Sequence, residues 1–457
     1  MMGDFKMMSC NDKACRGFGE DYKEFLSVAK TERECVGYFE NEAKKLGYRN
    51  LETIIAEGGS LTFGDKVYIK GMEKCILLFR IGKDLMDGIN IVASHIDSPR
   101  LDLKQNPLYA DSDLFYLDTH YYGGIKKYQW VALPLALHGV VMKNNGEKVV
   151  INIGEKDEDP VLYISDLLPH LAAEQMVKSG QKVVEGEKLD VLIGNQPENG
   201  EKGDSKDAAE RILPLLKEYY QIEKDDFFSA ELEIVPAGKA RDCGLDRSLI
   251  VGYGHDDRSC AYAAFRAFCD AAEGDKTLCC MLMDKEEIGS NGATGMQSYF
   301  YENAVNELLY LTGKASTVAQ GRVMRRSRVL SADVSAAYDP CYGEVFDKRN
   351  CAYLGKGPVF NKYTGARGKS GSNDANAEYL AVIRKILHDD DVTFQSAELG
   401  KVDAGGGGTI AYMAARYCME VVDCGIAVLS MHAPFEVISK ADLYETFRCY
   451  RTFFEKA

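Results

Sequence analysis

The sequence lacks the features that mark membrane, secreted and nucleic-acid-binding proteins. No stretch approaches the roughly 18 uninterrupted apolar residues that a membrane-spanning helix needs, and the first residues, MMGDFKMMSCNDKACRG, hold no apolar segment of signal-peptide length. Positive charge is scarce, because 55 lysines and arginines face 70 aspartates and glutamates, which gives a formal net charge of −15. This charge balance disfavours nucleic acid and acidic membrane surfaces as partners.

The 14 cysteines include no CxxC pair. They are scattered through apolar contexts such as TLCCMLM, which argues against a disulfide framework and against a zinc-finger site. Reduced, partly buried thiols fit a cytoplasmic protein, and we predict that location. The 457 residues, of which 46% are hydrophobic and 27% charged, are enough for two or more domains with a substantial core.

Residues 1–100 and 241–457 have the pattern of an α/β domain. Apolar residues recur at helical spacing over 19–47, and further along the chain apolar runs alternate with helix-like segments, which predicts a largely parallel sheet. The expected strands cover 66–70, 75–80, 89–95, 248–256, 277–287, 328–335 and 424–434. The expected further helices cover 259–273, 297–311 and 372–387.

Residues 101–240 differ in character. Alternation of apolar and polar residues in VALPLALHGVVM and KVVINI predicts antiparallel strands, and the polar start of 199–220 is expected to lead into a helix. We therefore expect a separate β-rich insert between the two parts of the α/β domain.

Residues of the types that bind metal ions stand where the expected strands end. In open α/β sheets, sites form in the crevice at the carboxyl ends of the strands, so these side chains are expected to meet at one edge. Any one such residue at a strand end commonly has a surface or capping role. Five segments that all end in metal-binding residue types are far less likely to arise by chance. The residues are His95, Asp256, Glu286 with Glu287, Asp333 and His432.

These residue types suit a pair of zinc ions. Two zinc ions carry four positive charges, and three carboxylates with two neutral imidazoles leave about one of these charges uncompensated. A bridging hydroxide would cancel that remaining charge, and this hydroxide is the nucleophile that such a site generates. Neighbouring carboxylates repel each other unless a cation or a proton lies between them, so one of Glu286 and Glu287 is expected to bind metal while the other moves a proton. Asp97 lies two residues after His95, close enough to orient its ring.

Five motifs in this order, SHIDSPRLDLK, GHDDRSC, DKEEIGS, SADVSAAYDP and SMHAPFE, closely resemble those of the aspartyl aminopeptidase / aminopeptidase I family of dizinc metallopeptidases. The resemblance covers essentially the whole chain. It implies a three-layer α/β/α zinc-peptidase catalytic domain in 1–100 and 241–457, interrupted by a β-rich dimerisation domain in 101–240. It also implies two zinc ions per subunit, with cobalt or manganese as possible replacements, and a homo-dodecamer built from dimers.

The resemblance assigns roles residue by residue. His95 resembles a terminal ligand of one zinc and Asp256 the bridging carboxylate, while Glu286 resembles the general base. The other ligands implied are Glu287, Asp333 and His432. The segment SDLLPHLAAEQ is similar to one whose histidine reaches a neighbouring subunit's active site, so His170 either acts in trans or is an ordinary histidine at a helix start.

Two segments depart from the family's pattern. Where members that select acidic residues carry a threonine-proline-cysteine-glycine run, this chain has KVDAGGGGTIAYMAAR, whose glycines from Gly405 to Gly408 would allow close backbone approach to a ligand. The segment GARGKSGSNDANAEYL also differs, although Lys369 could present a cation to a substrate carboxylate. A preference for acidic N-terminal residues is therefore left open.

The predicted function is that of a zinc-dependent aminopeptidase. It would hydrolyse the N-terminal residue of peptides with a free N-terminus through the metal-bridged hydroxide. One alternative is a dizinc deacylase or carboxypeptidase on the same scaffold, because a fold does not fix the substrate. Another is a non-catalytic, self-assembling binding protein, which would be expected to lack ligands, and here none is missing.

Overall fold

The computed structural model describes residues 12–195, 208–365 and 367–457. The chain divides into two compact units, each of which is described by itself. The α/β unit comprises Met1–Asp97, Ala240–Met431 and Glu436–Ala457, and the β unit comprises Ser98–Lys239 and His432–Phe435. No helix in the described part of the chain is both long and apolar enough to cross a membrane.

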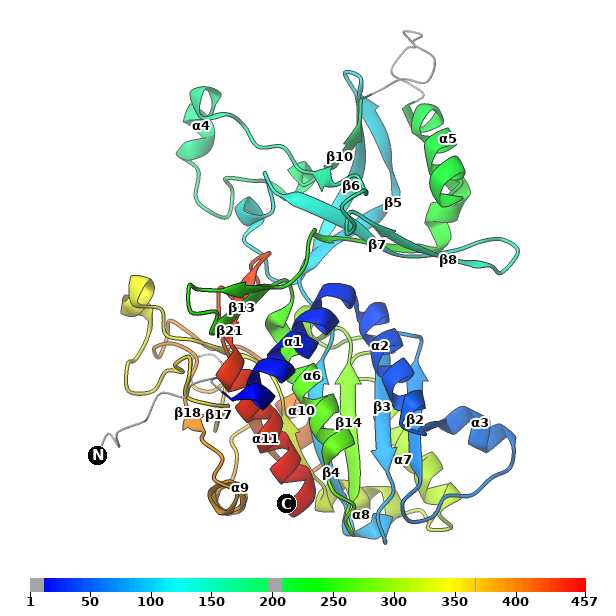
Figure 1. Ribbon diagram of the computed structural model, residues 1–457, viewed down its shortest axis with the longest axis vertical. Coiled ribbons are helices and arrows are strands. Elements are labelled where there is room, and N and C mark those ends of the chain that lie inside the picture. Colours follow the sequence, from blue (N-terminus) through cyan, green and yellow to red (C-terminus); the bar gives the residue numbers. More distant parts are fainter. Residues whose placement is uncertain (1–11, 196–207, 366) are drawn as a thin grey trace. The chain divides into compact units, whose positions relative to one another are not determined.

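A nine-stranded sheet forms the middle of the α/β unit (Figure 1). Five of its eight strand pairings are parallel, including all three among the four central strands, and the other three are antiparallel, so the sheet is largely parallel, as predicted. The order across the sheet is β1 (Arg49–Asn50), β2 (Lys66–Gly71), β3 (Cys75–Arg80), β14 (Thr277–Met283), β4 (Ile89–His95), β15 (Arg328–Ser331), β19 (Glu420–Gly425), β17 (Val359–Asn361) and β18 (Gln395–Ser396).

The two faces of this sheet are buried in two separate cores. Along β14, for example, Cys280 and Leu282 enter one core while Cys279 and Met281 enter the other, because successive side chains of a strand point to opposite faces. The helices of the first core are α1 (Lys13–Val28), α2 (Glu32–Lys45), α6 (His255–Asp270), α9 (Ala377–Asp389) and α11 (Lys440–Lys456). Those of the second are α3 (Leu51–Ala56), α7 (Phe300–Leu311), α8 (Ala319–Arg326) and α10 (Ala411–Ala415).

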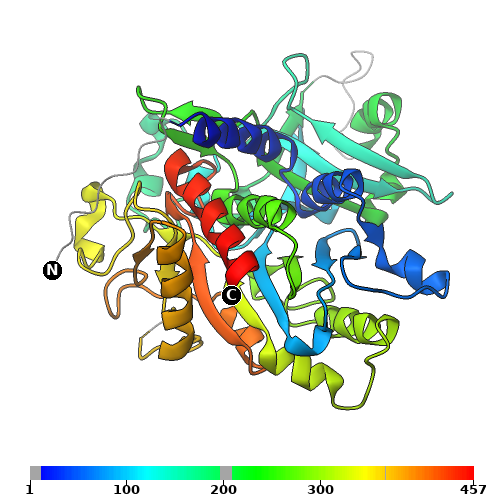
Figure 2. The ribbon, with the colours of Figure 1, turned by 60° about the horizontal axis from the view of Figure 1, so that its bottom comes forward.

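Figures 1 and 2 show α6 and α11 side by side on one face of the sheet, in agreement with the contacts between them. The predicted three-layer α/β/α arrangement is thus confirmed.

The helix predicted over 19–47 is two helices. The first, α1, ends at Val28. Thr31 caps α2, because its hydroxyl accepts a hydrogen bond from the amide of Glu34 while the Glu34 carboxylate accepts one from the amide of Thr31. This reciprocal capping box stabilises a helix start. The strands predicted over 248–256, 277–287 and 328–335 end early, at Gly252, Met283 and Ser331. The strand predicted over 424–434 is divided between the end of one strand at Gly425 and a short strand, Ala427–Leu429.

A second, five-stranded sheet completes the α/β unit. Its strands in order are β12 (Arg241–Cys243), β13 (Leu249–Gly252), β21 (Glu436–Ser439), β20 (Ala427–Leu429) and β16 (Ser335–Ala336). The pairing of β13 with β21 is antiparallel and brings Gly252 opposite Glu436.

The β unit contains a seven-stranded antiparallel sheet. Its strands in order are β11 (Ala230–Pro236), β5 (Arg100–Asp111), β6 (Leu114–Tyr122), β10 (Val191–Gly194), β9 (Leu162–Tyr163), β7 (Pro134–Met142) and β8 (Lys148–Ile153), and β11 also pairs with β7. Two helices accompany it, α4 (Ala173–Met176) and α5 (Ala208–Tyr220). The polar linker predicted before α5 lies partly in 196–207, outside the described residues.

The cysteines do not form a disulfide framework among the described residues. Twelve of them are free thiols, most of them buried or partly buried, whereas Cys15 is disulfide-bonded. The expectation of reduced thiols therefore fails at Cys15.

Candidate metal centre

Three central strands of the nine-stranded sheet end just before or at predicted site residues. Strand β4 ends on His95, Glu286 follows the end of β14 by three residues, and Asp333 follows the end of β15 by two. These strands are parallel, so their carboxyl ends lie at one edge of the sheet. Asp256 differs from the expectation, because it follows β13 of the five-stranded sheet and lies in the first turn of α6.

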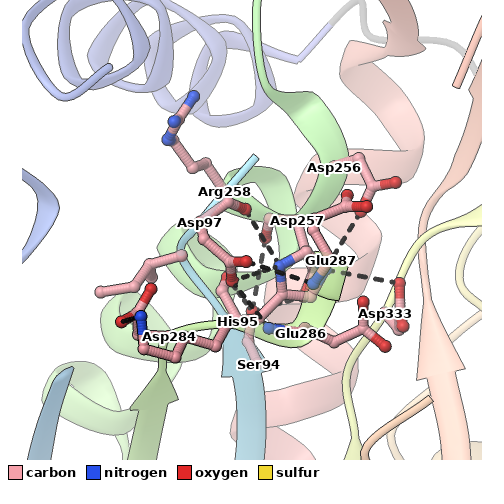
Figure 3. A network of polar contacts seen from close by, with 12 residues as sticks. Ser94, His95, Asp97, Asp256, Asp257, Arg258, Asp284, Glu286, Glu287 and Asp333 are labelled. Atoms are coloured by element: carbon pink, nitrogen blue, oxygen red, sulfur yellow. Dashed lines mark hydrogen bonds and ion pairs between the residues drawn. The ribbon is translucent and has the colours of Figure 1, made fainter. Parts of the chain in front are cut away.

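The side chains from these elements meet in one cluster (Figure 3). His95 Nε2 lies 3.2 Å from Asp256 Oδ1 and 3.9 Å from Asp333 Oδ1, and the donor atoms of all three residues lie within 4.8 Å of one another. A donor atom of Glu287 also lies within 4.8 Å of one of Asp256. Asp256 thus lies between the other donors, where a shared carboxylate ligand would have to be.

Asp97 organises the cluster without being one of its donors. His95 Nδ1 lies 3.0 Å from the carbonyl oxygen of Asp97 and 3.3 Å from its Oδ1, which directs Nε2 toward the other carboxylates. The same carboxylate accepts hydrogen bonds from the amides of Glu286 and Glu287, each at 3.1 Å. Asp97 therefore contacts both the histidine ring and the short 3-10 helix Glu286–Ile288 that carries both glutamates.

The cluster concentrates negative charge in a buried place. Burial opposes a charge on His95, but hydrogen bonds to Asp256 and Asp97 raise its pKa well above the usual value. Burial and the nearby Glu286 carboxylate raise the pKa of Asp333 well above its usual value. Figure 3 shows the Glu286 side chain extending toward Asp333.

This donor set fits a divalent metal ion. An imidazole nitrogen and carboxylate oxygens are ligands that zinc takes, and a cation among them would offset the repulsion that these carboxylates otherwise relieve by binding protons. The fit rests on the residues themselves, since His95, Asp256 and Asp333 already place three such donors within reach of one ion.

His432 belongs to the β unit. Its Nδ1 lies 2.9 Å from the carbonyl oxygen of Gly124, and with Nδ1 donating this bond the lone pair is on Nε2, the tautomer that a metal-binding imidazole requires. His170, also of the β unit, is exposed in the short turn Pro169–Leu171. The roles predicted for both histidines stay predictions.

Lys369 belongs to a different part of the α/β unit. Its Nζ lies 3.2 Å from Asp374 Oδ2 and 3.7 Å from the centre of the Tyr363 ring. It lines a cavity of about 280 Å³ together with Arg367 and Lys401. Both side chains of this ion pair are about half exposed, so the pair is weak.

The four-glycine run packs against its own chain. A Cβ on Gly405 would lie 2.0 Å from the carbonyl oxygen of Leu399, and the carbonyl oxygen of Gly407 accepts a hydrogen bond from the amide of Gly365 at 2.7 Å. Close backbone approach was expected, but the approaching backbone is that of the protein itself.

The sequence did not single out Ser94 or Glu436, whose side chains both lie near the cluster. The Ser94 hydroxyl donates to Asp257 Oδ2 at 2.5 Å, and burial raises the pKa of Asp257 to about 8. Glu436 accepts a hydrogen bond from the amide of Asp256 at 2.9 Å. The signal for Glu436 was present, because it ends the motif SMHAPFE four residues after His432.

A three-layer α/β domain that gathers an imidazole and several carboxylates where its strands end is the arrangement of a metal-dependent hydrolase. The family model described as aminopeptidase I zinc metalloprotease (M18) matches residues 25–454. The chain belongs to this family, and it is an aminopeptidase. The deacylase, carboxypeptidase and non-catalytic alternatives are not favoured.

Relatives and solved structures agree with this assignment. The chain is 56% identical over 437 residues to the probable M18 family aminopeptidase 1 of Clostridium acetobutylicum, covering 95% of this chain and 94% of the relative. The crystal structure of aminopeptidase I from the same organism matches with a TM-score of 0.92 at 52% identity and full coverage of both chains. The crystal structure of the Thermotoga maritima M18 aminopeptidase matches with a TM-score of 0.93 at 44% identity, covering 98% of each chain.

Proposed function

We propose that the chain binds two zinc ions and uses them to hydrolyse the N-terminal residue of peptides. His95 and Asp333 would hold one ion, Glu287 and His432 the other, and Asp256 would be shared. The observation that carries this proposal is the position of Asp256, whose donor atoms lie within 4.8 Å of those of His95 and Asp333 and also within 4.8 Å of a donor atom of Glu287.

The residues divide the chemical work. When bound, zinc supplies Lewis acidity toward the scissile carbonyl and lowers the pKa of water. Glu286 takes the proton from the attacking water and returns it to the leaving amine, a role typically worth about 100- to 10,000-fold in rate. Its neighbour Glu287 is held by the same aspartate, so Asp97 fixes the spacing between the base and a ligand.

The substrates are peptides with a free N-terminus. A preference for acidic N-terminal residues would require Lys369 to exchange its weak, half-exposed pair with Asp374 for a substrate carboxylate. We expect that preference to be modest. Cobalt and manganese accept the same nitrogen and oxygen donors and are expected to replace zinc.

The proposed assembly is a homo-dodecamer built from dimers in the cytoplasm, with the β unit as the dimerisation domain. A yeast relative of the same fold, matched with a TM-score of 0.77 at 20% identity and with 97% of each chain covered, is described as the mApe1 dodecamer. In such an assembly His170 would act in a neighbouring subunit's active site. The twelve free thiols favour a reducing compartment, and the disulfide at Cys15 is the exception to this pattern.

A panel of aminoacyl anilides tests the proposal. We expect hydrolysis of substrates with a free amine, none of their N-acylated counterparts, loss of activity on chelation, and recovery with zinc. Hydrolysis of the N-acylated compounds, or activity that survives complete removal of metal, would contradict it. Native mass measurement of the same preparation reports the assembly.

A further inference from the structure

Glu436 is a buried carboxylate beside the metal centre that is not one of its proposed ligands. Only 1% of its surface is exposed. It begins β21, and the antiparallel pairing with β13 places it opposite Gly252, four residues before Asp256. The register of the five-stranded sheet therefore brings this carboxylate to the start of α6.

The Glu436 carboxylate holds the backbone of Asp256. Its Oε2 accepts a hydrogen bond from the Asp256 amide at 2.9 Å. Asp256 has φ of −82° and ψ of 107°, outside the helical region, and the first amides of a helix have no partner within the helix. An acceptor oxygen at the right reach satisfies such an amide and fixes the backbone that carries it.

We propose that Glu436 is a positioning residue of the metal centre, which fixes Asp256 through its amide so that the Asp256 carboxylate faces both ions. This inference rests on the proposed role of Asp256 as the shared ligand. Glu436 then acts as Asp97 does. Glu436 accepts a hydrogen bond from the amide of Asp256, and Asp97 accepts hydrogen bonds from the amides of Glu286 and Glu287, although neither carboxylate is a proposed ligand. Loss of such a partner typically weakens metal binding about 10- to 100-fold.

The last motif of the sequence accordingly has two functions. In SMHAPFE, His432 is the predicted ligand, and Glu436 supports a ligand that lies about 180 residues earlier in the chain. A change in this motif is expected to affect both ions through Asp256, even where His432 is intact.

Zinc affinity, measured by competition with a chromophoric chelator, tests the inference without relying on activity. Glu436→Gln keeps an oxygen at the right reach and is expected to bind zinc within about threefold of wild type. Glu436→Asp keeps the charge but shortens the reach, and it is expected to bind about 10- to 100-fold more weakly, as is Glu436→Ala.

Glu445 provides the matched control. It is a buried glutamate of the same unit whose Oε1 accepts a hydrogen bond from the amide of Thr393 at 2.6 Å, and it belongs to α11. Glu445→Ala is expected to lose stability and keep wild-type zinc affinity.

Two results would overturn the inference: Glu436→Asp binding zinc as tightly as wild type, or Glu445→Ala weakening zinc binding as much as Glu436→Asp. Because Gln and Asp replace Glu436 without opening a large cavity, the comparison stands even if the alanine variant does not fold. A wild-type chain that takes up no zinc would instead contradict the proposed function, and the inference with it.

Discussion

Asp97 shows how far one side chain outside the ligand set can organise a site. Its carboxylate lies against the His95 ring and also accepts hydrogen bonds from two successive amides in a loop about 190 residues later in the sequence. The contact with His95 was predictable, because the two residues are neighbours in the chain. The contacts with Glu286 and Glu287 were not, because they depend on β4 and β14 pairing in register.

The separate roles of the paired glutamates can be tested at Glu286. Glu286→Gln removes the group that accepts a proton but leaves the proposed ligands, so the variant is expected to bind zinc normally and to lose about 100- to 10,000-fold in kcat. Metal content and kcat for one anilide check this. Glu287→Gln is the control, and it should lose zinc as well as activity. Turnover like that of wild type in a fully loaded Glu286→Gln would contradict the assignment.

At the scale of elements, a carboxylate joins helix α2 to strand β2. Burial alone would raise the pKa of Glu40, but hydrogen bonds from Lys44, Lys70 and Tyr68 lower it to about 2. Because the folded-state pKa is depressed, Glu40 contributes stability that is present above about pH 4.5, and that contribution is lost as the pH falls toward 2.

We therefore expect Glu40→Gln to lower the free energy of unfolding by about 1 kcal/mol at pH 7, a value discounted for screening by water. The difference from wild type should shrink below pH 4.5. Glu73→Gln is the control, because Glu73 pairs with the same Lys70 from a side chain that is 49% exposed. Denaturant unfolding at pH 7 and at lower pH checks the slope. A difference between wild type and Glu40→Gln that grows as the pH falls would contradict the linkage.

A hydrogen bond joins the residue after the glycine run to the central sheet. Thr409 donates its hydroxyl to Asp423 Oδ1 at 2.7 Å, and Asp423 is buried in β19, with burial raising its pKa to about 6. Thr409→Val leaves that oxygen without this donor and is expected to lower the free energy of unfolding by about 1–3 kcal/mol.

Thr452→Val is the comparison for this change. Thr452 donates to Asp390, whose side chain is 25% exposed and can exchange the lost bond for water, so a smaller loss is expected. Chemical denaturation at pH 7.5 measures both. Equal losses in the two variants would show that the burial of Asp423 does not matter.

The types of the helices and strands that position the site could largely be predicted from the sequence, but the residues at which they end could not. Apolar runs at β4 and β14 and the helical spacing in α9 gave the right type of element. The division of the first helix was visible in the capping sequence of Thr31 and Glu34. Strand β14 ends before Glu286, which begins a 3-10 helix, and β15 ends before Asp333. Apolar runs alone do not define these ends.

At the scale of the whole molecule, the sequence indicated the ligand types but not the sheets that supply them. Asp256 was expected from the same sheet as His95, yet it follows β13 of the five-stranded sheet, whose strand β21 begins 180 residues after Asp256 in the chain. Pairing over that separation is set by the complete fold. The contact between Glu436 and the Asp256 amide was missed for the same reason, although Glu436 stands in one of the recognised motifs.

Removal of metal is expected to destabilise the whole chain. Zinc that binds only the folded state stabilises it by about 2.7 kcal/mol when free zinc is 100 times its Kd. The apo protein should therefore have a lower Tm, and added zinc should restore it. Asp333→Asn is the control, because a ligand loss should reduce the zinc-dependent shift. An identical Tm with and without metal would contradict binding to the folded state at this site.

The most direct test of the central claim is anomalous scattering at the zinc edge from crystals of the zinc-loaded protein. The account predicts two peaks per chain, both within coordination distance of the Asp256 carboxylate, with His95 and Asp333 beside one and Glu287 beside the other. A single peak, or peaks away from Asp256, would contradict it.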